Sequence, residues 1–431
     1  MHRGRMTIRI TFPIKLNKKE KDAIAILKAG LESIKAKEVI KNTLKLNGNI
    51  LTIKNSRART KKYDLRNYKN IYLVGFGKGS GKLAIEVNKI LGRKIKEGQV
   101  NDNFSKKLGK IKIESCTHPN VSVINMYNTR KIFKIAEKAK EDDLVICIIT
   151  GGGSAMFTFP VIGFREMVVL NKMLIRSGAN IHEINAIRKH IDIAKGGWFA
   201  RRLFPAKVIS LIVSDVIGND PSIIASGPTT LNKDSSYYAL SILKKYDIPT
   251  MKLLPTPIES RYFEKIDNHI ILTNNNILEA MKKQAKKLKY DVSIFSNEVK
   301  GDVKHVSKEL VDKIKTSHKN CLIGAGETTV KITGIGTGGR NRELCLRSLK
   351  MLENDELLLA FDTDGIDNTE RAGGAFVDTK IKKIAHKKKL DIDQYLVVNN
   401  SEEFFKKTRS EIRTGPLDTN VSDVFILLKS S

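Results

Sequence analysis

An apolar run leads into four glycines and two lysines in the segment IYLVGFGKGSGKLA (residues 71–84). Backbone amides at such a turn, with the positive end of a helix dipole, favour an anion such as phosphate. The segment is no P-loop, because Phe76 and Leu83 stand where that motif needs Gly and Ser or Thr, and the fingerprint G-x-G-x-x-G fails as well. Lys78 therefore lies either in an anion-facing turn or in an ordinary strand-to-helix turn with solvated lysines.

A second glycine-rich stretch, TGGGSAMF (150–157), also follows an apolar run. Its glycines allow a ligand to approach the backbone, and Ser154 could cap the next helix while donating to an anion. A serine nucleophile is excluded, because Met156 replaces the second glycine of G-x-S-x-G. The stretch is either a structural turn or an anion-binding loop, whose ligands would be Gly151, Gly152, Gly153 and Ser154.

The segment NAIRKHIDIAKGGWFA (185–200) gathers polar and basic residues at helical spacing. Arginine binds a carboxylate or phosphate through two parallel bonds, whereas lysine acts as a point charge. Asn185, Arg188 and Lys195 are candidates for substrate binding, and a solvated basic helix is the alternative. We interpret His190 as a structural histidine.

Carboxylates follow the apolar run that ends in VSDVIGNDPSIIASGPT (213–229). Asp215 and Asp220 have the oxygen ligands that Mg²⁺ prefers, and Asp215 could instead accept a hydroxyl proton. Turn-capping aspartates are the alternative reading of this loop.

Two further loops carry isolated charges. In GAGETTVKITGIGTGGRNRE (324–343), Glu327 follows a strand and a glycine-rich entry delivers Arg340, which favours either anion recognition or a hairpin with an exposed arginine. In FDTDGIDNTERAGGAFVD (361–378), an EF-hand is excluded because its twelfth position is Gly373, but Asp364 remains as a magnesium ligand or loop cap. Glycine-rich cradles, placed cations and acidic strand ends together suit phosphoryl transfer.

Short apolar runs that alternate with amphipathic segments must position these residues. The runs lie at 71–76, 144–150, 208–215, 269–274, 320–326, 356–364 and 424–429. Continuous apolar runs suit strands covered on both faces, so the pattern predicts an α/β fold. Ligands bind outside the carboxyl ends of strands in open α/β sheets, which is where the polar stretches fall.

Three prolines (Pro249, Pro255 and Pro257) cluster before a fresh strand-helix series. They predict a larger N-terminal α/β domain at residues 1–255 and a smaller C-terminal one at 256–431.

The formal net charge of +31 is the compositional outlier and raises the alternative of nucleic-acid binding. The lysines are spread along helix-like segments, however, and aromatic residues make up only 6% of the chain, without basic-aromatic interleaving. We therefore expect a lysine-rich surface that steers small anions and binds no specific nucleic acid.

Targeting and redox signals are absent from the sequence. No apolar stretch reaches the roughly 18 residues of a membrane span, and the first 22 residues show no signal peptide. Four scattered cysteines without a C-x-x-C pair suggest reduced thiols. We expect a cytoplasmic protein without a membrane partner.

Long motifs in sequence order resemble the class of glycerate 2-kinases whose C-terminal half is called the MOFRL domain. They are VGFGKGSGKLA, GGGSA, NAIRKHIDIAKGG, SDVIGNDPSIIASGPT, GETTVKITGIGTGGRNRE, DTDGIDNTERAGGAFVD and TGPLDTNVSD. The resemblance implies two α/β (Rossmann-like) domains with an interdomain active-site cleft. It also implies ATP- and divalent-metal-dependent phosphorylation of D-glycerate at the 2-hydroxyl, giving 2-phosphoglycerate.

The resemblance further implies that Lys78 and Arg340 are active-site cations. We expect ATP to bind near the glycine-rich strand ends, with Mg²⁺ held partly by Asp215. Asp220 and Asp364 are further candidate metal ligands. Asn219 replaces an aspartate of the family motif, which makes a metal role depend more on Asp215. A hydroxypyruvate reductase is the alternative enzyme, and homo-oligomerisation is left open.

Overall fold

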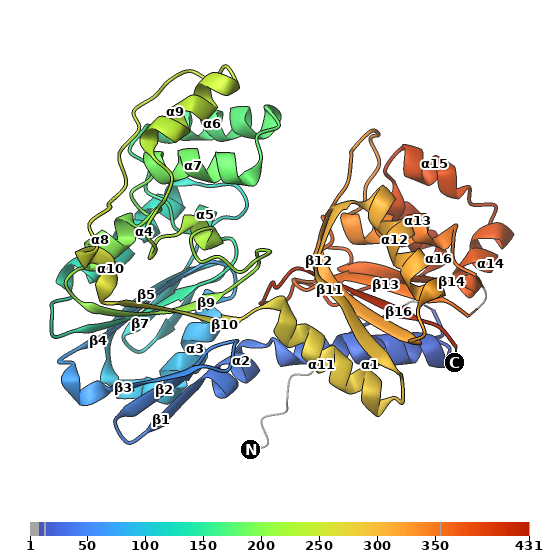
Figure 1. The fold of residues 1–431 in the computed structure, drawn as a ribbon, viewed down its shortest axis with the longest axis horizontal. Coiled ribbons are helices and arrows are strands. Elements are labelled where there is room, and N and C mark those ends of the chain that lie inside the picture. Colours follow the sequence, from blue (N-terminus) through green and yellow to red (C-terminus); the bar gives the residue numbers. More distant parts are fainter. Residues whose placement is uncertain (1–7, 13, 354, 431) are drawn as a thin grey trace. The chain divides into compact units, whose positions relative to one another are not determined.

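The computed structural model describes residues 8–12, 14–353 and 355–430, so part of the segment read for a signal peptide lies outside the described residues. The chain forms two compact units (Figure 1). One runs from Val39 to Leu272, and the other joins the residues up to Glu38 with those from Thr273 onward. Within the described ranges, no helix has the length and apolarity needed to span a membrane.

The unit Val39–Leu272 is built on a seven-stranded sheet with the order β10-β9-β8-β4-β5-β7-β6, parallel except for β6. Its strands are β4 (Ile71–Phe76), β5 (Ile95–Asp102), β6 (Lys106–Leu108), β7 (Ile111–Ser115), β8 (Leu144–Ile149), β9 (Lys207–Val213) and β10 (Ile266–Leu272). A small antiparallel sheet precedes it, with β1 (Leu44–Asn47), β2 (Ile50–Lys54) and β3 (Thr60–Asp64). Every residue of β4 and β8 is buried, which explains their unbroken apolar sequences.

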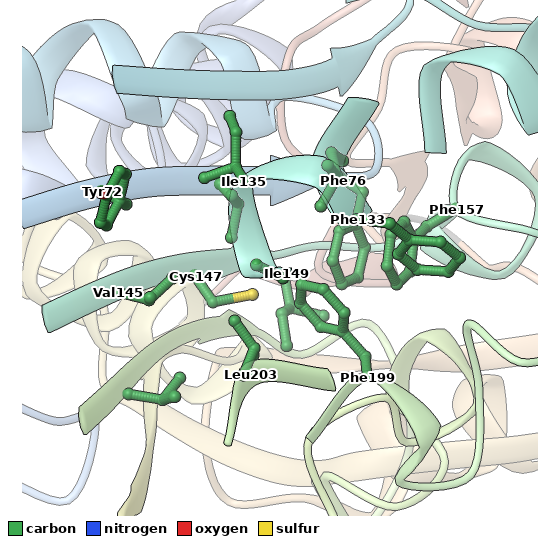
Figure 2. Close-up of a cluster of buried hydrophobic side chains, with 14 of the residues drawn as sticks. Tyr72, Phe76, Phe133, Ile135, Val145, Cys147, Ile149, Phe157, Phe199 and Leu203 are labelled. Carbon is green, nitrogen blue, oxygen red and sulfur yellow. The ribbon is translucent and has the colours of Figure 1, made fainter. Parts of the chain in front are cut away.

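The helices of this unit form two groups, one that packs on the sheet and one that encloses a separate hydrophobic core. They are α2 (Ala36–Thr43), which crosses into the unit, α3 (Ser80–Leu91), α4 (Val123–Lys138), α5 (Gly153–Met156), α6 (Phe164–Arg176), α7 (Ile181–Ile191), α8 (Trp198–Leu203), α9 (Ser236–Lys245) and α10 (Arg261–Glu264). Phe76, the last residue of β4, stacks on Phe157 with ring centroids 4.0 Å apart, and Phe199 meets Phe157 edge-on at 4.8 Å (Figure 2). This aromatic cluster supports the backbone from which the Lys78 turn departs.

The second unit holds a six-stranded mixed sheet with the order β11-β12-β16-β13-β14-β15. Its strands are β11 (Val292–Asp302), β12 (Cys321–Thr329), β13 (Leu357–Asp362), β14 (Gly374–Asp378), β15 (Glu411–Ile412) and β16 (Asp423–Leu428). Its helices are α1 (Lys18–Ser33), α11 (Asn274–Lys287), α12 (Val303–Thr316), α13 (Arg340–Leu349), α14 (Thr379–Lys387), α15 (Ile392–Val397) and α16 (Ser401–Thr408).

The α/β class is confirmed, but the strand directions in the second unit differ from a Rossmann-like sheet. Only β11 and β12 pair in parallel, and the remaining pairs are antiparallel. Strands β13 and β16 are nevertheless buried along their whole length. Burial on both faces therefore produces the continuous apolar runs here, whatever the strand direction.

The compact units do not follow the predicted ranges 1–255 and 256–431. Helix α1 packs against α11 closely enough that a Cβ on Gly30 would lie 2.7 Å from Met281 Cγ, so the N-terminal segment belongs with the C-terminal unit. The other boundary falls at Leu272, because β10 extends the seven-stranded sheet beside β9.

Candidate functional site

Three loops that carry predicted site residues leave one edge of the seven-stranded sheet. Strands β4, β8 and β9 are parallel neighbours, so their carboxyl ends lie side by side. The Lys78 turn follows β4, the triple-glycine loop follows β8 and Asp215 follows β9. This arrangement was predicted from the position of the polar stretches after the apolar runs.

The Lys78 turn is tied to the triple-glycine loop by a backbone bond, in which the amide of Lys78 donates to the carbonyl of Gly151 at 2.8 Å. The next amides at the start of α3 face an anion, as predicted, but that anion belongs to the protein. Asp102 accepts from the Gly79 amide at 3.1 Å and from the Gly81 amide at 2.7 Å. The expectation that these amides are open to a ligand is therefore wrong, because Asp102 at the end of β5 already occupies them.

Side chains from three loops surround the triple-glycine loop. A Cβ on Gly151 would lie 2.2 Å from Asp215 Oδ2, and a Cβ on Gly152 would lie 3.0 Å from His118 Nε2 and 3.4 Å from Lys78 Cγ. Gly152 has a φ of 77°, which favours glycine, and a side chain at Gly151 would displace the Asp215 carboxylate. We name Lys78, His118, Gly151, Gly152 and Asp215 the glycine-loop cluster.

His118 was missed by the sequence analysis. It is an exposed residue of the loop between β7 and α4, and no glycine-rich or acidic motif marks that loop. A single histidine before a proline is a weak signal, so only the packing of the loops could identify it.

Two backbone amides of the triple-glycine loop are candidate donors to a ligand. Within the described ranges, the amides of Gly151 and Gly152 donate to no backbone or side-chain acceptor. Gly153 instead packs against the side chain of Ala225, where a Cβ would lie 2.7 Å from the Ala225 Cβ.

Ser154 does not cap α5, contrary to the prediction, because the cap position is taken by Gly152 with φ of 77°. The Ser154 hydroxyl lies 2.8 Å from the Ser226 hydroxyl, which donates to Asn185 Oδ1 at 3.2 Å. Ser154 and Asn185 are thus brought together through Ser226, beside the glycine-loop cluster.

The basic residues of α7 and the loop after it point inward. Lys195 donates to Asp192 Oδ2 at 2.6 Å and to the Phe157 carbonyl at 3.0 Å, with a side chain only 3% exposed. Burial lowers the pKa of Lys195, although the negative charge of Asp192 acts to raise it. Arg188 donates to Asn171 Oδ1 at 3.0 Å. These contacts are internal, so the alternative of a solvated basic helix is wrong.

His190 is structural, as interpreted from the sequence. Its Nδ1 lies 2.6 Å from the Leu254 carbonyl and its Nε2 lies 3.1 Å from the Asp234 carbonyl. Both ring nitrogens lie within hydrogen-bond distance of backbone carbonyls, so the residue joins α7 to two loops.

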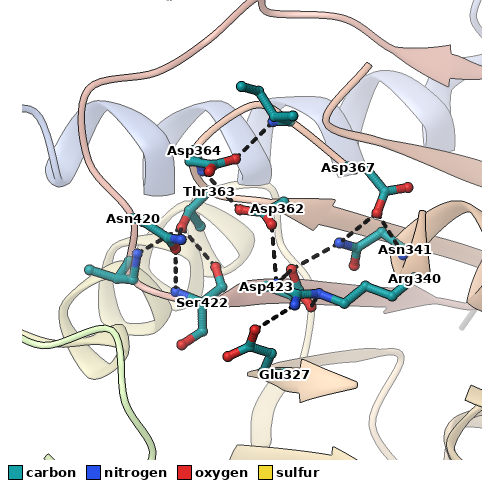
Figure 3. Close-up of polar contacts among 12 residues, drawn as sticks. Glu327, Arg340, Asn341, Asp362, Thr363, Asp364, Asp367, Asn420, Ser422 and Asp423 are labelled. Atoms are coloured by element: carbon teal, nitrogen blue, oxygen red, sulfur yellow. Dashed lines mark hydrogen bonds and ion pairs between the residues drawn. The ribbon is translucent and has the colours of Figure 1, made fainter. Parts of the chain in front are cut away.

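The second unit presents a cluster of carboxylates around one arginine (Figure 3). The strand register places Asp362, the last residue of β13, opposite Asp423, the first residue of β16, and Asp423 lies opposite the residue before Glu327 on β12. Arg340 begins α13 and reaches all three carboxylates. We name Glu327, Arg340, Asp362 and Asp423 the Arg340 cluster.

Four bonds hold the guanidinium of Arg340. Its Nε and Nη2 donate to Asp423 at 2.6 and 3.0 Å, Nη2 also donates to Asp362 at 3.2 Å, and Nη1 donates to Glu327 at 2.5 Å. The alternative of a hairpin with an exposed arginine is wrong. Asp423, the strongest partner, was missed by the sequence analysis because it lies 83 residues from Arg340.

The entry to α13 repeats the arrangement seen at α3. Asp367 accepts from the amides of Asn341 at 3.0 Å and Arg342 at 2.9 Å. A Cβ on Gly339 would lie 2.2 Å from Asp367 Oδ1, so the glycine-rich entry makes room for a carboxylate of the protein. Asp364 is nearby in sequence, and its Oδ1 accepts from the amide of Ile366 at 2.9 Å.

The charges of the Arg340 cluster shift its titrations. Burial would lower the pKa of Arg340, but the carboxylates of Asp423 and Glu327 outweigh burial and raise it. Burial, with the charges of Asp423 and Asp364, raises the pKa of Asp362 well above its ordinary value. Burial also raises the pKa of Asp423, to about 6. Asp362 is the readier proton acceptor, because Arg340 donates two bonds to Asp423 and one to Asp362.

The variant Asp362→Asn is expected to gain stability relative to wild type as the pH rises. The folded carboxyl releases its proton at a higher pH than the unfolded one, so wild-type stability falls between the unfolded and the folded pKa. We therefore expect the free energy of unfolding of the variant, relative to wild type, to rise between about pH 5 and about pH 7.5. Denaturant unfolding of both proteins at the two pH values measures it, and a pH-independent difference would contradict the raised pKa.

Comparisons with known proteins cover both clusters. A family model described as "Domain of unknown function (DUF4147)" matches residues 22–260, which include the glycine-loop cluster. The model of the MOFRL family matches residues 320–423, which include the Arg340 cluster.

Relatives with assigned names match over nearly the whole chain. The D-glycerate 2-kinase of Thermotoga maritima is 32% identical over 426 residues, covering 94% of this chain and 97% of that protein. The glycerate 2-kinase of Pyrococcus horikoshii is 31% identical over 386 residues, covering 84% and 88%. The crystal structure of glycerate kinase from Thermotoga maritima is similar with a TM-score of 0.82 at 30% identity, covering 95% of this chain and 99% of that one.

Proposed function

This chain belongs to the glycerate 2-kinase family with a C-terminal MOFRL domain, and on that premise we propose that it transfers a phosphoryl group from ATP to the 2-hydroxyl of D-glycerate. The products are 2-phosphoglycerate and ADP. One observation carries the proposal: the 32% identity to a D-glycerate 2-kinase extends over 94% of the chain, and the two family models include both clusters.

Lys78 and Arg340 are the proposed catalytic cations. Phosphoryl transfer depends on positioning and on neutralising negative charge, and glycerate adds a carboxylate of its own. Each of the two cations is proposed to meet one of these anions, the carboxylate of glycerate or the transferring phosphoryl group. The open amides of Gly151 and Gly152 add donors for an oxygen of the substrate or nucleotide.

Asp215 is the proposed residue for the reacting hydroxyl or the metal. Its carboxylate lies against Gly151, beside the loop that carries the open amides. In one role it accepts the hydroxyl proton, and in the other it is a ligand of Mg²⁺. Asn185 and Ser154 line the same loop through Ser226. Lys195 donates to the Phe157 carbonyl at the end of this stretch, whereas Arg188 donates to Asn171 on α6, so we propose supporting roles for both.

Magnesium is compatible with the residues present if ATP supplies most of its ligands. Mg²⁺ binds in kinases through one or two carboxylates together with substrate phosphates and retained waters. Across the described residues, no three His, Cys, Asp or Glu side chains are grouped to hold a metal ion. Asp215 is the first candidate ligand, since its carboxylate lies against Gly151 in the triple-glycine loop. When bound, the metal would neutralise charge on the phosphates.

Glu327 is the partner of Arg340 that a substrate anion can replace. Its side chain is 50% exposed, whereas that of Asp423 is fully buried. The variant Glu327→Gln weakens a charge-assisted bond to a neutral one, so we expect the KM for D-glycerate to fall about fivefold. Steady-state kinetics beside the control Glu309→Gln, an exposed residue on α12, measure this. A rise in KM would show instead that Glu327 holds Arg340 in its productive position.

We also place the enzyme in the cytoplasm, where its four buried cysteine thiols stay reduced.

The activity is tested by following ADP formation with ATP and Mg²⁺, in the presence of D-glycerate, of L-glycerate or of no acceptor. ADP formation that depends on D-glycerate supports the proposal. NADH oxidation with hydroxypyruvate, without D-glycerate-dependent ADP, would assign a reductase instead.

A further inference from the structure

The amides that begin α3 are occupied by a carboxylate from the neighbouring strand. Asp102 is the last residue of β5 and is fully buried. The register pairs Phe76 of β4 with Asn101, which brings Asp102 beside the turn that follows β4. Its two oxygens accept from the Gly79 and Gly81 amides at 3.1 and 2.7 Å.

These bonds fix the backbone directly after Lys78. The amide of Lys78 itself donates to the Gly151 carbonyl, so the turn is held on both sides of this residue. A phosphate at the start of a helix uses the same amides and the same helix dipole. An internal carboxylate at that position therefore excludes a phosphate and fixes the direction in which the Lys78 side chain leaves the turn.

The other proposed catalytic cation is presented in the same manner. Asp367 accepts from the amides of Asn341 and Arg342 directly after Arg340 and is almost fully buried. Each cluster thus has one cation in a glycine-rich entry that is filled by an aspartate from a distant part of the chain.

We propose that Asp102 is a positioning residue for Lys78, and that the glycine turn binds no phosphate of the nucleotide. Substrate anions meet the side chain of Lys78, while Asp102 permanently occupies the amides of the turn. This inference rests on the proposed function, because Lys78 is placed there as a catalytic cation.

Three variants of the full chain test the inference. Asp102→Asn keeps the shape of the side chain but removes its charge, and Asp102→Ala opens a space that formate can enter. Asp143→Asn is the matched control, because Asp143 is a buried carboxylate at the opposite edge of the same sheet that accepts from the Asn70 side chain and the Lys140 amide. ATP- and D-glycerate-dependent ADP formation, circular dichroism and thermal unfolding are measured for each.

We expect Asp102→Asn to lower kcat at least tenfold with an unchanged KM for ATP, and Asp143→Asn to keep kcat within about twofold. Formate should restore at least part of the kcat of folded Asp102→Ala and should leave wild type unaffected. A kcat for Asp102→Asn within twofold of wild type would overturn the inference. So would an Asp102→Ala protein that is folded and slow but does not respond to formate, or an increased KM for ATP in Asp102→Asn. Failure of the proposed function is distinct, because wild type would then form no ADP with D-glycerate.

Discussion

The variant Lys78→Ala is expected to lose about 10³-fold in kcat while keeping its fold. Alanine retains the backbone amide that donates to the Gly151 carbonyl, so the turn is preserved. What disappears is the positive charge of a side chain whose Cγ lies beside Gly152. Catalysis here depends on neutralising a phosphoryl group and a carboxylate, and water cannot substitute for the positive charge of the lysine. ADP formation under saturating ATP and D-glycerate measures the effect.

Lys89→Ala is the matched control for Lys78→Ala. Lys89 lies on the same helix, α3, and pairs with Glu86 on its exposed surface. Its removal should leave kcat within about twofold and thermal stability nearly unchanged, as is usual for exposed ion pairs. A Lys78→Ala protein that retained more than about a tenth of the wild-type kcat would remove Lys78 from the mechanism.

The variant Arg340→Ala should lose both turnover and stability. Asp423 is fully buried and accepts two bonds from Arg340, and Asp362 is also buried. Without the arginine these carboxylates remain in the interior without their cation, which costs about 3–5 kcal/mol of unfolding free energy. Denaturant unfolding and ADP formation measure the two losses separately.

Arg340→Lys separates charge from geometry at this position. Lysine supplies a positive charge to the carboxylates but cannot make the paired bonds of a guanidinium to Asp423. We expect it to regain part of the stability while turnover stays at least about tenfold below wild type. Wild-type turnover in either variant would exclude Arg340 from catalysis, and an unchanged unfolding free energy in Arg340→Ala would contradict the cost of the unpaired carboxylates.

Much of the seven-stranded sheet could be predicted, because the candidate site residues come directly after its strands along the chain. The unbroken apolar runs of β4 and β8 indicated strands buried on both faces, and the glycines after them indicated the edge where ligands bind. Lys78, Gly151 and Asp215 could therefore be placed at this edge of the sheet from the sequence. The ranges of the two units could not be predicted in this way, because no local sequence pattern indicates that α1 packs on α11.

The residues that the sequence analysis missed reach their partners from neighbouring strands of a sheet. Asp102 meets the Lys78 turn only because β5 lies beside β4, and Asp423 meets Arg340 only because β16 lies between β12 and β13. The order of strands in a sheet depends on the tertiary fold, and the hydrophobic pattern of the sequence does not predict it. Lys195 had a local signal, since Asp192 stands three residues before it, but burial decides whether such a pair is a surface bridge or an internal one.

The identity of the phosphorylated product tests the assignment most directly. The full-length protein would be incubated with ATP, Mg²⁺ and D-glycerate, and phosphorus NMR would be recorded beside authentic 2-phosphoglycerate and 3-phosphoglycerate. We predict that 2-phosphoglycerate appears in equal amount with ADP for wild type, and that Lys78→Ala and Arg340→Ala form neither at a comparable rate. Formation of 3-phosphoglycerate, or ATP consumption without any phosphorylated glycerate, would contradict the assignment of a glycerate 2-kinase.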